Sequence, residues 1–372
     1  MSVPANPPDY RGPLAGLRVV EFAAIGPAPF AGMLMRQLGA ELMRIDRPAT
    51  DGHRLLPIDP RFDLLNRGKP VLELDLKKAA DVDRALDVIA AAEVVIEGFR
   101  PGVMERLGLG PDACLARNPA LIYGRVTGWG QDGPLAQNAG HDISYIALTG
   151  ILNAIGEAGR GPVPPLNLVG DFAGGGLYLV IGILAAREEV RRTGRGQVID
   201  AAMIDGASHL MSFVHGLSQA GFWSNERGSN QTDGGFPFNA VYRCGDGRYL
   251  AVAAAEMKFR RDFLSRIGLG EEAARKGDAP GEWPGLYAQI AAVLGTRSRD
   301  DWAAMLDGPD TCVVPVLDLD ETPSHPHNIA RRIYRMEADG TRVTAAAPRF
   351  SHGDPTPDPA DASTLLNRWA ER

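Results

Sequence analysis

The chain has 372 residues, of which 45% are hydrophobic and 23% are charged, a composition typical of a globular protein. Its 39 basic and 46 acidic residues give a net charge of −7, which argues against nucleic acid as a partner, because phosphate binding needs a basic surface. The longest nearly uncharged apolar run, 172–186, is shorter than the about 20 residues of a membrane span, so we expect a soluble protein without one.

Short apolar runs alternate with helical patterns along the first two hundred residues. The runs predict strands at 17–22, 41–46, 71–76, 94–99, 121–126 and 197–202. Apolar residues at helical spacing predict helices at 30–38, 79–92 and 172–192. Strands that alternate with helices in this way form βαβ units, so the fold class is α/β with a mostly parallel sheet.

The composition changes near 225–235, where the sequence NERGSNQTDGG is typical of a linker. Two strand patterns around CGDGR then predict a β-hairpin within 240–254, followed by helical patterns and a strand at 312–317. We therefore predict a smaller α+β domain after the first. The expected division is a large domain over 13–205, a linker over 206–237, the small domain over 238–322, and a segment over 323–372 that returns to the large domain.

The three cysteines, Cys114, Cys244 and Cys312, lie far apart in the chain. They form neither a disulfide framework nor a CxxC metal pattern, and no other residues have metal-ligand spacing. The first residues lack a basic segment followed by an apolar core, so no secretory signal is predicted. We expect a cytoplasmic protein without a metal site.

A GxGxxG pattern spans Gly128–Gly133 and follows a predicted strand. A dinucleotide fingerprint would open a helix and would have an acidic residue at the end of the next strand, and neither feature follows here. A nicotinamide or flavin oxidoreductase is therefore disfavoured. A tight glycine loop that lets some ligand approach the backbone is the better interpretation.

Two polar residues stand at predicted helix starts. His141, in GHDISY, follows a glycine-rich loop and is either a structural residue or a catalytic group beside an anion-binding helix N-terminus. Asp171, in NLVGDFAGGG, is either a helix N-cap or a carboxylate kept ionised by the helix N-terminus, as a base or a nucleophile requires. Only the tertiary fold can bring together these two residues, which are thirty positions apart.

Charged residues near predicted strand ends are further candidates. Glu256 ends an apolar run, a place where a lone glutamate is normally solvated. Phosphates bind at the strand ends of open α/β sheets, and Arg44, Arg47, Arg100 and Arg106 lie near such ends. Each arginine taken alone is better explained as a surface residue.

The stretches LRVVEFAAIGPAPFAGMLMRQLGAELMRIDRP, GHDISY and NLVGDFAGGG resemble the family III CoA transferases, and in particular their racemases, from about residue 13 to about residue 350. The resemblance implies a large Rossmann-like domain, a small domain, and two subunits that interlock like chain links into a homodimer. It implies epimerisation at C2 of 2-methyl-branched acyl-CoA thioesters, with coenzyme A entering as part of the substrate and no other cofactor.

The resemblance also implies roles for individual residues. His141 and Asp171 are the two acid/base groups, and Glu256 reaches the histidine from the partner subunit's small domain. The backbone N–H of Asp142 helps to bind the thioester oxygen. The residues implied to hold coenzyme A and its thioester are Arg47, Leu74, Asp75, Leu76, Lys77, Arg100, Arg106, Gly140, Asp142, Ile143, Ser144 and Tyr145.

The sequence departs from this family at two places next to the coenzyme A end, where it has extra N-terminal residues and a longer stretch over 53–63. Three alternatives stay open. A CoA transferase on the same fold would use Asp171 as the nucleophile. The others are a non-catalytic CoA-binding protein and an oxidoreductase built on Gly128–Gly133.

Overall fold

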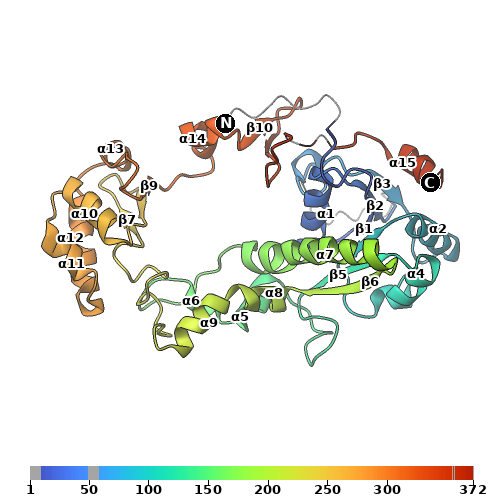
Figure 1. Ribbon diagram of the computed structural model, residues 1–372, viewed down its shortest axis with the longest axis horizontal. Coiled ribbons are helices and arrows are strands. Elements are labelled where there is room, and N and C mark those ends of the chain that lie inside the picture. The colour runs from blue at the N-terminus through green and yellow to red at the C-terminus, as the bar shows by residue number, and fades with distance from the viewer. Residues whose placement is uncertain (1–9, 49–57, 354, 356, 372) are drawn as a thin grey trace. The chain divides into compact units, whose positions relative to one another are not determined.

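A computed structural model of the chain describes residues 10–48, 58–353, 355 and 357–371 (Figure 1). The described residues form two compact units. The first comprises those up to Thr149, then Pro165–Met211, and those from Arg332 onward. The second comprises Gly150–Pro164 and Ser212–Arg331.

The first unit is built on a six-stranded parallel sheet with the order β3-β2-β1-β4-β5-β6. Its strands are β1 (Arg18–Phe22), β2 (Glu41–Asp46), β3 (Val71–Glu73), β4 (Val94–Glu97), β5 (Ile122–Thr127) and β6 (Gln197–Ala202). The predicted α/β class with a parallel sheet is confirmed, although β3 ends earlier than predicted. The strand order reverses between β1 and β4, and ligands of such sheets bind beyond the carboxyl ends of the strands at this point.

Helices cover both faces of this sheet. Val19 and Val94 belong to the core that contains residues of α1 (Pro27–Gln37) and α7 (Tyr178–Thr193). Their neighbours Val20 and Val95 belong to the opposite core, since successive strand residues point to opposite faces. That core contains residues of α2 (Ala79–Ala90), α4 (Pro111–Arg117) and α15 (Ala362–Ala370). Two covered faces explain why the strands are uninterrupted apolar runs.

The long helix of this unit begins at Leu168 rather than at Phe172. It comprises a π-helical part, η3 (Leu168–Leu177), which continues directly into α7. With 26 residues and a mean hydropathy of 1.8 over its most apolar window, it is long and apolar enough to cross a membrane by length and composition alone. The expectation that this segment is too short was therefore wrong. In the structure α7 packs on β5 and β6, and η3 packs on α1 and on α8 (Met203–Leu210).

The remaining elements of the first unit are short. They are η2 (Pro60–Phe62), α3 (Val103–Arg106), α5 (Asp142–Ala147), and the antiparallel pair β10 (Tyr334–Met336) and β11 (Arg342–Thr344). After β6 the helical chain is interrupted at Met211, between α8 and α9 (Ser212–Gln219).

The second unit contains a three-stranded antiparallel sheet with its own core. Its strands are β7 (Ala240–Arg243), β8 (Tyr249–Val252) and β9 (Val313–Pro315), and the predicted β7–β8 hairpin is confirmed. Its helices are α6 (Ile151–Ala154), α10 (Met257–Arg266), α11 (Glu271–Lys276), η4 (Pro280–Glu282), α12 (Trp283–Leu294), α13 (Arg299–Met305), η5 (Thr322–Ser324) and α14 (Pro326–Ala330), together with α9.

The helix α15, which the sequence did not predict, joins the C-terminal residues to β2. Trp369 is buried, and its Nε1 donates a hydrogen bond of 2.8 Å to Oε2 of Glu41. We expect Trp369→Ala to lower the free energy of unfolding by about 3–5 kcal/mol, because it empties a core position and removes this donor. Urea unfolding measures the change. Trp369→Phe, which keeps most of the ring volume, should cost less, and equal losses for both variants would contradict a packing role.

Candidate active site

A cavity of about 280 Å³ lies at the carboxyl edge of the parallel sheet. Ile25 follows β1, Arg100 follows β4 and Trp129 follows β5, and all three line it. His141 and Asp171 line the same cavity. The fold therefore brings both predicted acid/base residues to one space, at the point where the strand order reverses.

His141 is the residue that precedes the first turn of α5, and its side chain is exposed. Its backbone is extended, with φ −136°, and its N–H lies 3.5 Å from Oγ of Ser144. The glycine loop before it accommodates Tyr145, since a Cβ atom at Gly128 would lie 2.0 Å from the Tyr145 ring. Gly128 of the GxGxxG pattern thus serves packing, and the next helix along the chain is α5, not one that opens at the pattern.

Asp171 lies inside η3, one turn after the N-cap residue Asn167. The N-cap alternative is therefore wrong for Asp171. Nδ2 of Asn167 donates to its Oδ2 at 3.2 Å, and its own backbone N–H donates to Oδ2 of Asp142 at 2.7 Å. A Cβ atom at Gly26, whose φ is +72°, would lie 2.8 Å from the Asp171 carboxylate. The turn between β1 and α1 thus needs glycine to leave room for this side chain.

Burial raises the pKa of the Asp171 carboxyl group, and the negative charge of Asp142 raises it further. The hydrogen bond from Asn167 and the charge of His141 act in the opposite direction. Desolvation thus opposes the expected effect of the helix N-terminus, which favours the ionised carboxylate. A raised pKa suits a carboxyl group that must carry a proton during part of a catalytic cycle.

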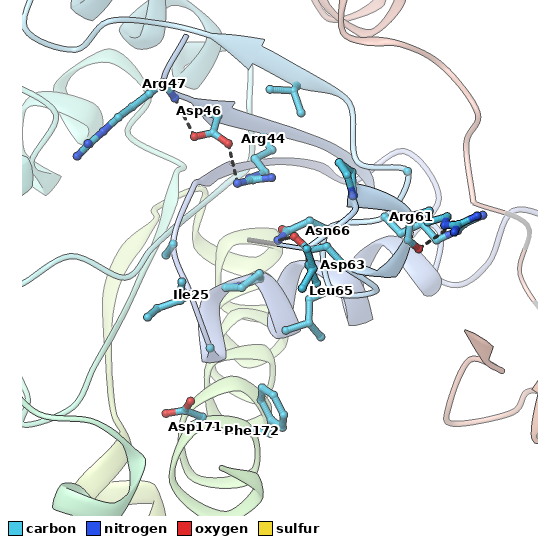
Figure 2. Close-up of a pocket in the computed structure, with 18 of the residues that line it drawn as sticks. Ile25, Arg44, Asp46, Arg47, Arg61, Asp63, Leu65, Asn66, Asp171 and Phe172 are labelled. Carbon is cyan, nitrogen blue, oxygen red and sulfur yellow. Dashed lines mark hydrogen bonds and ion pairs between the residues drawn. The ribbon is translucent and has the colours of Figure 1, made fainter. Parts of the chain in front are cut away.

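A larger cavity of about 920 Å³ adjoins the same carboxylate, as Figure 2 shows. Asp171 and Ile25 line both cavities. Four arginines line the larger one, and three of them form ion pairs, which are Arg44–Asp46 (2.6 Å), Arg61–Asp59 (3.3 Å) and Arg67–Asp339 (2.9 Å). Arg47 forms no ion pair with a described residue, which makes its guanidinium the best placed of the four to meet an anionic ligand.

A buried ion pair anchors the loop that forms one wall of the larger cavity. Nζ of Lys69 donates to both carboxylate oxygens of Glu21, at 2.8 and 2.7 Å, and to the carbonyl of Pro29 at 2.9 Å. Both side chains are almost completely buried. The loop that carries Asn66 and Arg67 into the cavity is thereby fixed to β1 and α1.

The other predicted ligand-binding residues divide into two groups. Arg100, Gly140 and Tyr145 line the smaller cavity, and Arg47 lines the larger. The side chain of Leu74 is 1% exposed and packs in the core, so it is not available to a ligand. The residues that line neither cavity are Asp75, Leu76, Lys77, Arg106, Asp142, Ile143 and Ser144. Glu256 is an exposed residue before α10, in the second unit.

Several cavity residues were not predicted from the sequence. Asn167 could have been found, because it lies one helical turn before Asp171. Arg61 lies in the short helix η2 and Arg67 in the loop after it, and neither segment has a periodic pattern. Part of the stretch 53–63, which was expected to be longer than in the family, lies outside the described residues. Within the described ranges, no three His, Cys, Asp or Glu side chains are grouped so as to hold a metal ion.

Comparison with known proteins identifies the family. The chain is 40% identical to alpha-methylacyl-CoA racemase of Mus musculus, over 92% of this chain and 88% of that protein. It is also 40% identical to the Homo sapiens enzyme of the same name, over 86% and 81% of the two chains. A crystal structure of a CaiB/BaiF family protein from Brucella suis superposes with a TM-score of 0.79 at 27% identity, covering 97% of this chain and 99% of that one. Residues 14–361 match the sequence profile of CoA-transferase family III, and the chain belongs to that family.

Proposed function

We propose that the protein racemises 2-methyl-branched acyl-CoA thioesters at C2. The observation that carries this proposal is the presence of His141 and Asp171 in the walls of one cavity. Support comes from the 40% identity to two proteins named alpha-methylacyl-CoA racemase.

The proposed reaction uses one base and one acid on opposite sides of C2. Neutral His141 takes the C2 proton of one enantiomer, and the electron pair moves into the thioester to form an enolate. Protonated Asp171 then delivers a proton to the other face of C2, and the reverse reaction exchanges the two roles. We infer that the backbone N–H of Asp142 stabilises the enolate oxygen. This chemistry requires no metal, flavin or nicotinamide.

The assembly in this proposal is an interlocked homodimer in which Glu256 of one subunit orients His141 of the other. The first unit would hold coenzyme A through Arg47, Arg100 and neighbouring residues, and the second unit would supply Glu256. A cytoplasmic location stays a prediction from the scattered cysteines.

Solvent deuterium tests the proposed reaction. In D2O, (R)- or (S)-2-methylacyl-CoA should gain deuterium at C2 as its stereochemistry is lost, measured by mass spectrometry and chiral chromatography. A rate no higher than that of a buffer control would refute the proposal.

A CoA transferase is the second candidate, because the family is named for this reaction and the Asp171 carboxylate reaches both cavities. In that reaction Asp171 attacks the thioester carbonyl to form a mixed anhydride and releases the CoA thiolate. The thiolate then attacks the Asp171 carbonyl, which releases the acyl group as a carboxylate and leaves Asp171 as a CoA thioester. Hydroxylamine would convert such an intermediate to a hydroxamate at Asp171. Peptide mass spectrometry after incubation with acyl-CoA would detect it, and the racemase proposal expects none.

The proposed role of Arg47 in binding coenzyme A predicts a change in KM. We expect Arg47→Ala to raise the KM for acyl-CoA about tenfold with little change in kcat, because a phosphate would lose a charge-assisted hydrogen bond. The difference should shrink at high salt, since the arginine is exposed. Arg191→Ala, at the exposed end of α7, is the matched control. An unchanged KM for Arg47→Ala would remove this residue from the binding site.

A further inference from the structure

The side chain of Asp142 connects the two candidate acid/base residues. Asp142 directly follows His141 in the chain and begins α5, which packs against η3. It is 5% exposed, and its Oδ2 accepts the backbone N–H of Asp171 at 2.7 Å. One carboxylate thus joins the start of the His141 helix to the turn that carries Asp171.

The position of this carboxylate lowers the stability of the folded protein. Its Oδ1 is buried and has no hydrogen-bond partner among the described residues. A buried charged group with an unsatisfied oxygen destabilises the folded state, and such groups occur where a function needs them. The helix leaves room for it at Gly170, where a Cβ atom would lie 2.6 Å from Oδ2 of Asp142. The backbone of η3 is therefore shaped around this contact.

We propose that the Asp142 carboxylate is a positioning residue for racemisation, holding the Asp171 turn of η3 against the start of α5 so that both acid/base groups line one cavity. This inference rests on the proposed function. It concerns the side chain alone and is separate from any role of the Asp142 backbone N–H.

The carboxylate has two effects that mutations can separate. As an acceptor it fixes the backbone of Asp171. Burial raises the pKa of Asp171, and the negative charge of Asp142 raises it further. The hydrogen bond from Asn167 and the charge of His141 lower this pKa. Burial is the main cause that raises the pKa of Tyr145 to about 12, and the negative charges of Asp171 and Asp142 raise it as well.

Three variants test the proposal on the full chain. Asp142→Ala removes acceptor and charge, and should lower kcat for racemisation about 10- to 100-fold with KM within about threefold, because a misplacement near 1 Å costs about 100-fold. Gly170→Ala keeps the charge but forces the carboxylate away, and should lower kcat similarly. Asp142→Asn keeps an acceptor oxygen, and should retain kcat within about fivefold.

The pH profile of kcat separates charge from geometry. Removing the Asp142 charge lowers the pKa of Asp171, so the limb of the profile that depends on Asp171 should move to lower pH in Asp142→Asn and Asp142→Ala. It should stay near its wild-type position in Gly170→Ala. Asp361→Ala is the control for stability, because it removes a comparable carboxylate–backbone hydrogen bond, to Thr364 at 2.8 Å, outside both cavities.

The outcomes distinguish this inference from the proposed function. If the wild-type protein does not introduce deuterium at C2, the proposed function is refuted, whatever the variants at Asp142 show. If the wild type exchanges but Asp142→Ala and Gly170→Ala keep wild-type kcat, the positioning role is overturned. Should Asp142→Ala fail to fold by thermal melting, an unchanged kcat in Gly170→Ala together with an unmoved pH limb in Asp142→Asn overturns the proposal.

Discussion

Racemisation should fall about 1000-fold in His141→Ala and in Asp171→Asn made singly, because each variant removes one of the two proton-transfer groups. Binding of CoA, measured by calorimetry, should stay within a few-fold of wild type, since neither side chain is proposed to hold the nucleotide. The rate is measured as loss of optical purity of a 2-methylacyl-CoA thioester.

Isotope exchange makes this prediction more specific. A variant with one remaining base can remove the C2 proton of one enantiomer and return deuterium to the same face. His141→Ala and Asp171→Asn should therefore each exchange a different single enantiomer without inverting it. Exchange of both enantiomers by either variant would contradict a two-base mechanism.

A histidine outside the cavities provides the matched control. His209 lies on α8 in the same unit and hydrogen bonds with the hydroxyl of Tyr178 at 2.7 Å. His209→Ala should racemise at close to the wild-type rate. If it lost activity as severely as His141→Ala, the effect at position 141 could not be assigned to proton transfer.

The parallel sheet could be predicted from the sequence because its strands are buried on both faces. Val19, Val20, Val94 and Val95 all pack in cores, so β1 and β4 appear as uninterrupted apolar runs between polar segments. The helix α15 could not be predicted in its role, because the partner of Trp369 is Glu41, far away in the chain. A short amphipathic segment after a proline-rich stretch has no local sign of where it will pack.

The sequence predicted some residues of the site but not the properties that depend on contacts in the folded chain. Motif resemblance pointed to His141 and Asp171, and the fold places both in one cavity. The upward shift of the Asp171 pKa could not be predicted, because the burial of this carboxyl group and the nearby charge of Asp142 arise only in the folded chain. Leu74 was proposed as a ligand contact, yet alternation along β3 and the residues after it turns its side chain into the core.

Mixing two inactive variants tests whether Glu256 acts across subunits. Glu256→Ala alone should lower racemisation about 10- to 100-fold, since the proposed partner that orients His141 is lost. In an interlocked dimer, one chain carrying His141→Ala and another carrying Glu256→Ala create one site with both changes and one site with neither. Co-expressed at equal levels, they should recover about a quarter of wild-type activity, because half of the dimers are mixed and each mixed dimer has one intact site.

The same mixture gives a different result if Glu256 acts within its own chain. Both sites of a mixed dimer would then carry one defect, and activity would stay at the level of the weaker variants. Co-expressing His141→Ala with Asp171→Asn is the matched control, because both residues line one cavity of the same unit and every site of a mixed dimer keeps one defect. Recovered activity in that control would show that each subunit contributes more than Glu256 to the site of the other. If activity recovers when His141→Ala is mixed with Glu256→Ala but not when it is mixed with Asp171→Asn, Glu256 acts in the site of the opposite subunit. Activity then requires the dimer.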